Sequence, residues 1–182
     1  MKLQKGRKSA RGQTLIEAMI ALIIMSIGIL GIAGMQVLSL QQNRGAMFRA
    51  EATQLGNDLM DRLRVNTGIV YNALLDADPT SAQSCEVNPC TPVQMAAFDI
   101  AQWKCSINSV DAAGDTFTVC KDYTPPVEGI TGSLPLGAGS VALVNGVYEV
   151  TVQWSEDRID VPCGSRTTET ACASITLRAQ VN

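Results

Sequence analysis

The feature that most constrains this chain is a run of 23 residues without a charged side chain, from Ala18 to Leu40. A helix rises 1.5 Å per residue, so this run can cross the hydrocarbon core of a bilayer, which is about 30 Å thick. The residues before it are basic, and lysine and arginine stay on the cytoplasmic side of a membrane. The sequence therefore predicts a single-pass membrane helix with a cytoplasmic N-terminus. The basic residues of this leader are Lys2, Lys5, Arg7, Lys8 and Arg11.

The composition argues against several function classes. The net charge of −3 becomes −8 once the five leader cations are left out, and an acidic remainder gives no reason to expect general nucleic-acid binding. The chain has no histidine, the commonest general base and metal ligand. We also find no recognisable nucleophile–base arrangement. The sequence therefore predicts a protein that is not an enzyme and that has no metal site and no cofactor.

Three interpretations of the N-terminal segment compete. It could be a plain signal anchor. It could be a secretory signal cleaved before Gly34, because Gly31-Ile32-Ala33 supplies small residues, but the apolar run is longer than the 7–15 residues usual for such signals. It could also be a signal cleaved after Gly12 on the cytoplasmic side, which leaves the apolar helix on the mature chain.

The motif around Gly12 favours the third interpretation. Gly12 is followed by Gln13-Thr14-Leu15-Ile16-Glu17-Ala18 and then by the apolar run. This pattern resembles the type IV prepilin signature: a glycine, a first mature residue, and then Thr-Leu-Ile-Glu. The resemblance implies that a prepilin peptidase cuts between Gly12 and Gln13 and methylates the new amine of Gln13. The family usually has Phe or Met at the position of Gln13.

A physical role for Glu17 follows from this resemblance. A carboxylate near hydrocarbon is costly, so it needs a partner. Cleavage leaves an ammonium group on Gln13, with a pKa of about 7.7–8.0 for an α-amino group. In a bundle of parallel helices, the Glu17 carboxylate of one subunit can neutralise this ammonium in its neighbour. We therefore expect Glu17 to set the register of subunit assembly.

Three glycines lie within the apolar run, at Gly28, Gly31 and Gly34. No strand precedes them, so they do not form a nucleotide-binding loop. Their spacing of three does not match the G-x-x-x-G dimerisation motif. Two interpretations remain, close helix packing and local weakening of the helix.

The apolar pattern predicts that the helix continues to about Asn66. Asp58 and Arg62 are four residues apart, which favours an ion pair, and Asn66-Thr67-Gly68 supplies a stop. Asp58, Asp61, Arg62 and Arg64 together are typical of a solvated helix face. The apolar stripe of this second half consists of Phe48, Ala52, Leu55, Leu59 and Leu63.

Alternating apolar and polar residues predict strands downstream. Val141–Val144, Asn145-Gly146 and Val147–Trp154 read as a hairpin with a type I′ turn. Residues 174–181 alternate in the same way, and a weaker hairpin is expected from Trp103 to Cys120, turning near residues 112–114. Residues 72–101, 122–140 and 157–171 are expected to be loop-rich, and loops 72–101 and 122–140 are the expected contact surfaces.

All six cysteines follow the apolar run, and in an exported domain such an even set predicts disulfides. None of the spacings is the C-x-x-C of zinc or redox sites. Six cysteines allow 15 connectivities. Sequence-local pairing is the simplest and gives Cys85–Cys90, Cys105–Cys120 and Cys163–Cys172.

These patterns define an α+β fold class of the pilin-like type. We expect a long N-terminal α-helix, transmembrane in its first half, that packs on an antiparallel β-sheet with disulfide-stapled loops. The expected domains are a cleaved leader at residues 1–12, a transmembrane and assembly helix at 13–40, an amphipathic continuation at 41–66, and a periplasmic or extracellular head at 67–182.

The segment from Glu51 to Asn66 resembles the "A-x-x-L-x-x-D-x-x-D-R-x-R-x-N" stretch of the PilV-type minor pilins. The resemblance implies a minor pilin that primes or modifies a type IV pilus and supports adhesion, twitching motility or DNA uptake. The implied partners are the prepilin peptidase, other minor pilins, the major pilin and the inner-membrane assembly platform. The protein would lie in the inner membrane with its head in the periplasm, and later in the fibre (fimbrium) at the cell surface.

Two alternatives from other function classes remain open. A minor pseudopilin of type II secretion has the same kind of N-terminal signal and helix but serves secretion. The phenotype of a deletion would distinguish a pseudopilin from a pilin. A signal-anchored periplasmic enzyme is the remote alternative, which an activity screen would test.

Overall fold

The computed structural model describes residues 15–75, 77–80, 83–86, 88–111, 113–121, 130–156 and 172–180. The chain divides into two compact units, Met1–Arg44 and Gly45–Asn182. Helix α1 (Leu15–Val65) contributes residues to both units. The second unit is called the head below.

Helix α1 has 51 residues and ends at Val65, close to the boundary at Asn66 that the sequence predicts. The backbone N–H of Asn66 donates to the carbonyl of Arg62 at 3.1 Å, which closes the last turn. Gly68 then adopts a φ of +89°, a left-handed conformation that glycine tolerates and that turns the chain away from the helix.

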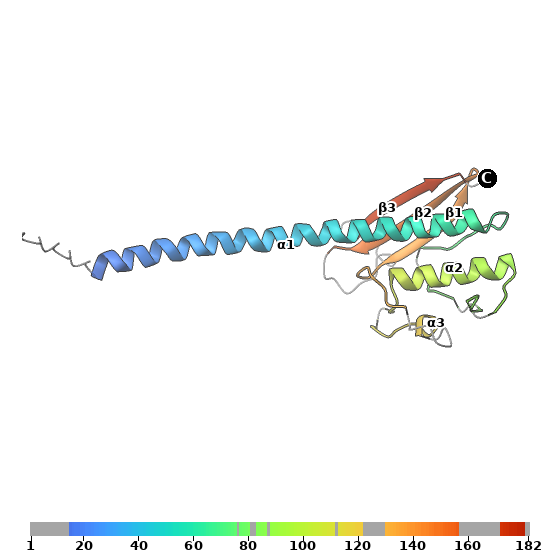
Figure 1. Ribbon diagram of the computed structural model, residues 1–182, viewed down its shortest axis with the longest axis horizontal. Helices are drawn as coiled ribbons and strands as arrows, with labels where there is room; N and C mark the ends of the chain where they lie inside the picture. The colour runs from blue at the N-terminus through green and yellow to red at the C-terminus, as the bar shows by residue number, and fades with distance from the viewer. Residues whose placement is uncertain are drawn as a thin grey trace, which may run out of the picture. The chain divides into compact units, whose positions relative to one another are not determined.

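The head contains a three-stranded antiparallel sheet in the order β1-β2-β3 (Figure 1). Its strands are β1 (Ala138–Val144), β2 (Val147–Ser155) and β3 (Cys172–Ala179). The predicted hairpin is confirmed. Asn145 and Gly146 have φ values of +52° and +80°, and positive φ at both central residues is the requirement of a type I′ turn.

The prediction of a second hairpin from Trp103 to Cys120 is wrong in its first part, which belongs to helix α2 (Pro92–Ile107). A short antiparallel bridge between Val110 and Thr116 does flank the expected turn. Helix α2 also takes up the last part of the stretch 72–101, which the sequence predicts to be loop-rich. Thr91 caps it: the Thr91 hydroxyl accepts from the Gln94 N–H, and the Gln94 side chain accepts from the Thr91 N–H. The short helix α3 (Thr118–Lys121) follows.

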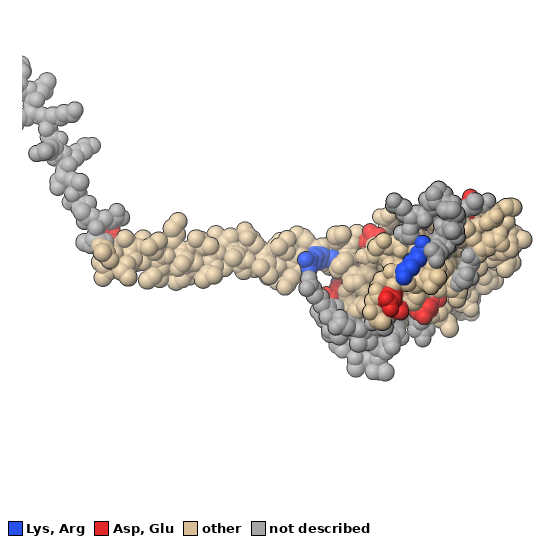
Figure 2. Space-filling model, turned by 90° about the horizontal axis from the view of Figure 1, so that it is seen from below, with Lys and Arg blue, Asp and Glu red and all other residues tan. Residues whose placement is uncertain are grey.

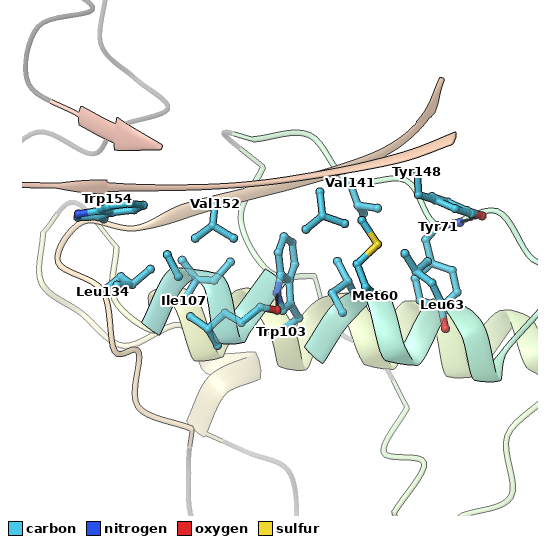
Figure 3. Close-up of a cluster of buried hydrophobic side chains, with 14 of the residues drawn as sticks. Met60, Leu63, Tyr71, Trp103, Ile107, Leu134, Val141, Tyr148, Val152 and Trp154 are labelled. Atoms are coloured by element: carbon cyan, nitrogen blue, oxygen red, sulfur yellow. Dashed lines mark hydrogen bonds between the residues drawn. The ribbon is translucent and has the colours of Figure 1, made fainter. Parts of the chain in front are cut away.

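Helix α2 and the head part of α1 pack on the same face of the sheet (Figure 3). The α1 stripe predicted from the sequence is confirmed, because Ala52, Leu55, Leu59 and Leu63 are buried and Phe48 packs against them. The sheet contributes the alternate residues Tyr148, Val150, Val152 and Trp154, also as predicted.

Trp103 of α2 lies at the centre of this core and is fully buried. Its indole N–H donates to the backbone carbonyl of Leu55 on α1 at 2.9 Å, which satisfies the polar atom of the side chain. Gly139 of β1 leaves room for the indole, because a Cβ atom at this position would lie 2.6 Å from Trp103 Cη2. One tryptophan therefore joins both helices and the sheet.

Two disulfides fasten the segments around α2. Cys85–Cys90 closes the loop before α2, and Cys105–Cys120 joins α2 to α3. Both are sequence-local pairs. Cys172 at the start of β3 is also disulfide-bonded. The expected partner Cys163 lies outside the described residues.

Candidate functional site

The first unit of the chain consists, where it is described, of an exposed apolar helix. The large apolar side chains from Leu15 to Leu40 are between 52% and 79% exposed. In the space-filling view, the surface of this part of α1 carries almost no charged residue (Figure 2). Its length and apolar composition suit a membrane span. Such a surface requires lipid or other apolar helices around it.

Ser26 is a polar residue within this apolar run. The hydroxyl of Ser26 donates to the carbonyl of Ile23 at 2.8 Å, within the helix itself. In an apolar environment an unsatisfied hydroxyl is costly, so this internal bond makes Ser26 compatible with lipid or with a helix bundle.

Glu17 lies in the first turn of α1 and is exposed. A carboxylate is favourable at this end of a helix, because the unsatisfied N–H groups of the first turn carry partial positive charge. Gly12 and Gln13, the predicted cleavage and methylation positions, lie outside the described residues. The register role of Glu17 remains a prediction.

Gly28, Gly31 and Gly34 all lie within α1, and a Cβ atom at any of them would meet nothing within 4 Å. Nothing in a single chain therefore requires glycine at these positions. Close packing against a neighbouring helix and local weakening of α1 both remain compatible with this observation.

Arg62 of α1 links the two helices of the head. Its Nε donates to Asp58 at 3.0 Å, the ion pair that the sequence predicts. Its Nη1 also donates to Asp99 of α2 at 3.0 Å and to Gln102 at 2.6 Å. The interpretation of Arg62 as part of a solvated face is therefore wrong, whereas Asp61 and Arg64 form an exposed pair of the expected kind.

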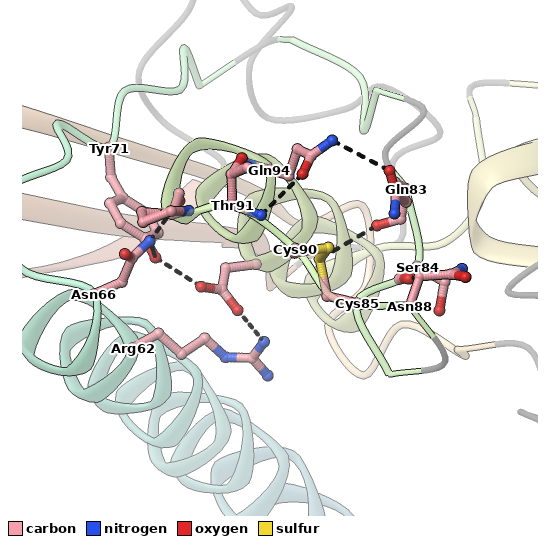
Figure 4. Close-up of a disulfide and its surroundings, with 12 residues drawn as sticks. Arg62, Asn66, Tyr71, Gln83, Ser84, Cys85, Asn88, Cys90, Thr91 and Gln94 are labelled. Carbon is pink, nitrogen blue, oxygen red and sulfur yellow. Dashed lines mark hydrogen bonds and ion pairs between the residues drawn. A yellow bond between two sulfur atoms is a disulfide. The ribbon is translucent and has the colours of Figure 1, made fainter.

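Tyr71 extends this polar cluster to the segment that follows α1 (Figure 4). Its hydroxyl donates to the Asp99 carboxylate at 2.6 Å and accepts from Asn66 at 3.0 Å. Burial raises the pKa of Tyr71, and the hydrogen bond to Asp99 raises it further. The side chain is fully buried and stays protonated. Arg62, Asp99, Tyr71 and Asn66 therefore form one connected network, called the Arg62 network below.

The Arg62 network does not follow from the sequence patterns, because these do not predict α2, which supplies Asp99 and Gln102. One local signal was available. Thr91, Pro92 and Gln94 form the pattern of a capping box with proline at the first helical turn. The described residues contain no group of three or more potential metal ligands.

Comparison with known families gave two matches. A family described as the prokaryotic N-terminal methylation motif matches residues 7–33. A family described as type IV pilin Tt1218 matches residues 34–101. The two ranges adjoin and together contain all of α1 and the first part of α2. The chain matched no curated protein and no solved structure.

The long apolar N-terminal helix, the three-stranded sheet that packs on its second half and the methylation motif define the pilin-like class of α+β proteins. Within this class, the family matches support a type IV pilin that takes part in pilus or pseudopilus assembly. Type IV pilins are structural proteins. The matches imply processing by a prepilin peptidase, contacts with other pilins, and anchoring in a membrane through the N-terminal helix.

Proposed function

We propose that this chain is a minor pilin of the PilV type that primes or modifies a type IV pilus. The observation that carries the proposal is the uncharged helix surface from Ala18 to Leu40, which begins directly after the Gly12–Glu17 motif and is exposed in the single chain. A minor pilin must bury this surface twice, first in the inner membrane and then among the helices of the fibre.

The assembly mechanism uses burial and charge rather than bond chemistry. The apolar helices of neighbouring subunits pack closely against one another, and this packing holds the subunits together. Glu17 and the ammonium of Gln13 in the adjacent subunit neutralise one another. A subunit in the wrong register would bury an unpaired charge, at a cost of several kcal/mol. Glu17 therefore selects the register at which a subunit joins.

The disulfides support an extracytoplasmic location for residues 67–182. The described cysteines are all disulfide-bonded, and such bonds persist in oxidising compartments. The Glu51–Asn66 segment supports the PilV assignment, because it is the part of the chain that resembles these minor pilins. In this segment Arg62 and Asn66 contact α2 directly, Asn66 through a 2.8 Å bond to the Pro92 carbonyl.

The mature N-terminus tests the proposal. Mass spectrometry of the protein from a producing cell should give a chain that starts at Gln13 and carries one added methyl group. A Gly12→Ala variant should accumulate with its leader, and a matched Gly6→Ala variant should be processed normally. A mature chain that starts at Gly34 would contradict the proposal, because the assembly helix would then be lost.

A deletion separates the pilus from the type II secretion alternative. Loss of surface fibres or twitching with normal secretion supports the minor pilin. Normal fibres with a secretion defect would instead identify a minor pseudopilin.

A further inference from the structure

The two outer edges of the sheet differ. The edge of β1 is partly covered, because Ala73 pairs with Val141 through two backbone hydrogen bonds of 2.9 and 3.0 Å. No described strand or bridge pairs with the outer edge of β3. Figure 1 shows β3 as the last strand of the sheet on this side.

The direction of the backbone groups on β3 follows from the register. The N–H and C=O of Val141 point to Ala73, away from β2, so the opposite residue Val150 directs its own groups to β3. Val150 lies opposite Leu177, which therefore pairs with β2. Because the direction alternates along a strand, Ser174, Thr176 and Arg178 direct their N–H and C=O groups outward from the sheet.

Within the described residues, strand β3 itself carries neither a proline nor a bulge, two features that natural sheets use to prevent edge pairing. Its eight pairs with β2 follow an unbroken register. Its only charge, Arg178, forms an ion pair with Glu149 of β2 at 2.8 Å and is thus held by the sheet. The Thr176 hydroxyl likewise bonds to Thr151.

We propose that the outer edge of β3 is a docking site for an extended strand of another pilin subunit, which adds to the sheet as a fourth strand. Backbone bonds to Ser174, Thr176 and Arg178 give the affinity. On the helix side, the added strand continues the apolar face of Ile175 and Leu177, both only partly buried. On the other side, it lies beside the polar residues of β3. The partner strand therefore alternates apolar and polar residues.

The partner is a different pilin rather than a second copy of this chain. Leu177 packs on Gly56 of α1, and β3 runs in the same general direction as α1 in the head (Figure 1). An antiparallel β3–β3 contact between two copies requires a two-fold axis perpendicular to the strands, and this axis reverses α1 in the second copy. Subunits that insert with a basic leader on the cytoplasmic side share one helix direction.

Hydrogen exchange tests this inference, which rests on the proposed function only in taking the partner to be a pilin. The full-length chain is purified in detergent twice, alone and in the assembly isolated with other pilins from fibre-producing cells. The amides of Ser174, Thr176 and Arg178 should exchange freely in the chain alone and at least about tenfold more slowly in the assembly. The amides of Ile175 and Leu177 should be protected in both samples.

A matched pair of variants gives a second readout. Ser174→Pro removes one outward N–H without breaking the pairing with β2, whereas Ser174→Ala keeps it. The proline variant should enter the assembly at least about tenfold less than the alanine variant. Unchanged protection of Ile175 and Leu177 in the proline variant alone shows that the head is folded.

Three results would overturn the inference. The edge amides could exchange equally in both samples, the two variants could assemble equally, or protection could appear in a dimer of the chain alone. None of these results affects the proposed function if the chain still enters the fibre. A chain that never joins other pilins would contradict both.

Discussion

Arg62 of α1 and Asp99 of α2 form an ion pair at 3.0 Å, with the Asp99 side chain only 9% exposed. Asp99 also accepts the hydroxyl proton of Tyr71, so one nearly buried carboxylate holds three segments of the head. Such a carboxylate is stabilising only while its partners are present, because a buried charge without partners is costly.

We predict that Asp99→Ala lowers the free energy of unfolding by about 2–4 kcal/mol, because it leaves Arg62 and the Tyr71 hydroxyl without their shared acceptor. The matched control is Asp61→Ala, whose carboxylate is 71% exposed and which should cost less than about 1 kcal/mol. Urea unfolding of the full chain in detergent measures both, with fluorescence of the buried Trp103 and Trp154 as the signal. Equal effects of the two variants would contradict the role of Asp99.

We predict that Tyr71 makes the head less stable at alkaline pH. Burial raises the pKa of Tyr71 above its ordinary value of 10.0, so the folded state keeps the proton while the unfolded state loses it. The contribution of Tyr71 to the free energy of unfolding is fully present below pH 10. It falls as the pH rises above 10, by up to about 1.4 kcal/mol per pH unit.

The test compares the wild-type chain with Tyr71→Phe between pH 8 and 11, a range from about two units below to about one unit above the usual tyrosine pKa. The variant is less stable at pH 8, because it loses the bonds to Asp99 and Asn66. The difference in unfolding free energy between the two proteins should shrink above pH 10. A constant difference would show that Tyr71 ionises equally in both states.

We predict that Gly139→Ala destabilises the head by about 1–3 kcal/mol through overpacking. A Cβ atom at Gly139 would lie 2.4 Å from Ile107 Cδ1 and 2.6 Å from the rigid indole of Trp103. Ser140→Ala, on the opposite face of β1, is the control and should be close to neutral. Thermal unfolding of both variants decides the question, and a neutral Gly139→Ala would show that α2 can shift away from the sheet.

We predict that Glu17→Ala leaves processing intact but lowers incorporation into pili about tenfold or more, because the neighbouring ammonium loses its partner. Glu17→Asp keeps the charge and should assemble better than Glu17→Ala. Immunoblots of sheared fibres, normalised to the processed protein in membranes, give the ratio. Normal incorporation of Glu17→Ala would remove the register role.

The elements that the sequence predicts well are those with a strong local pattern. The membrane run, the stripe from Phe48 to Leu63 and the Asn145-Gly146 turn each follow from residues close together in the chain. Helix α2 was missed because Trp103, Cys105 and Ile107 alternate as in a strand. The helical spacing of Ala96, Ile100, Trp103 and Ile107 is the pattern that the structure uses.

The Arg62 network could not be predicted for a different reason. Arg62 and Asp99 are 37 residues apart, and only the packing of α2 on α1 brings them together. Taken alone, Asp58 and Arg62 form an ordinary surface pair. The same limit applies to Trp103, whose hydrogen bond to Leu55 joins positions 48 residues apart.

The pairing of Ala73 with Val141 has a consequence for the size of any assembly built through the sheet. This short contact occupies the outward backbone groups of Val141 in the middle of β1, so a strand that adds to this margin cannot pair continuously along it. Continued addition of strands at both margins, which would give an amyloid-like ribbon, is thereby disfavoured.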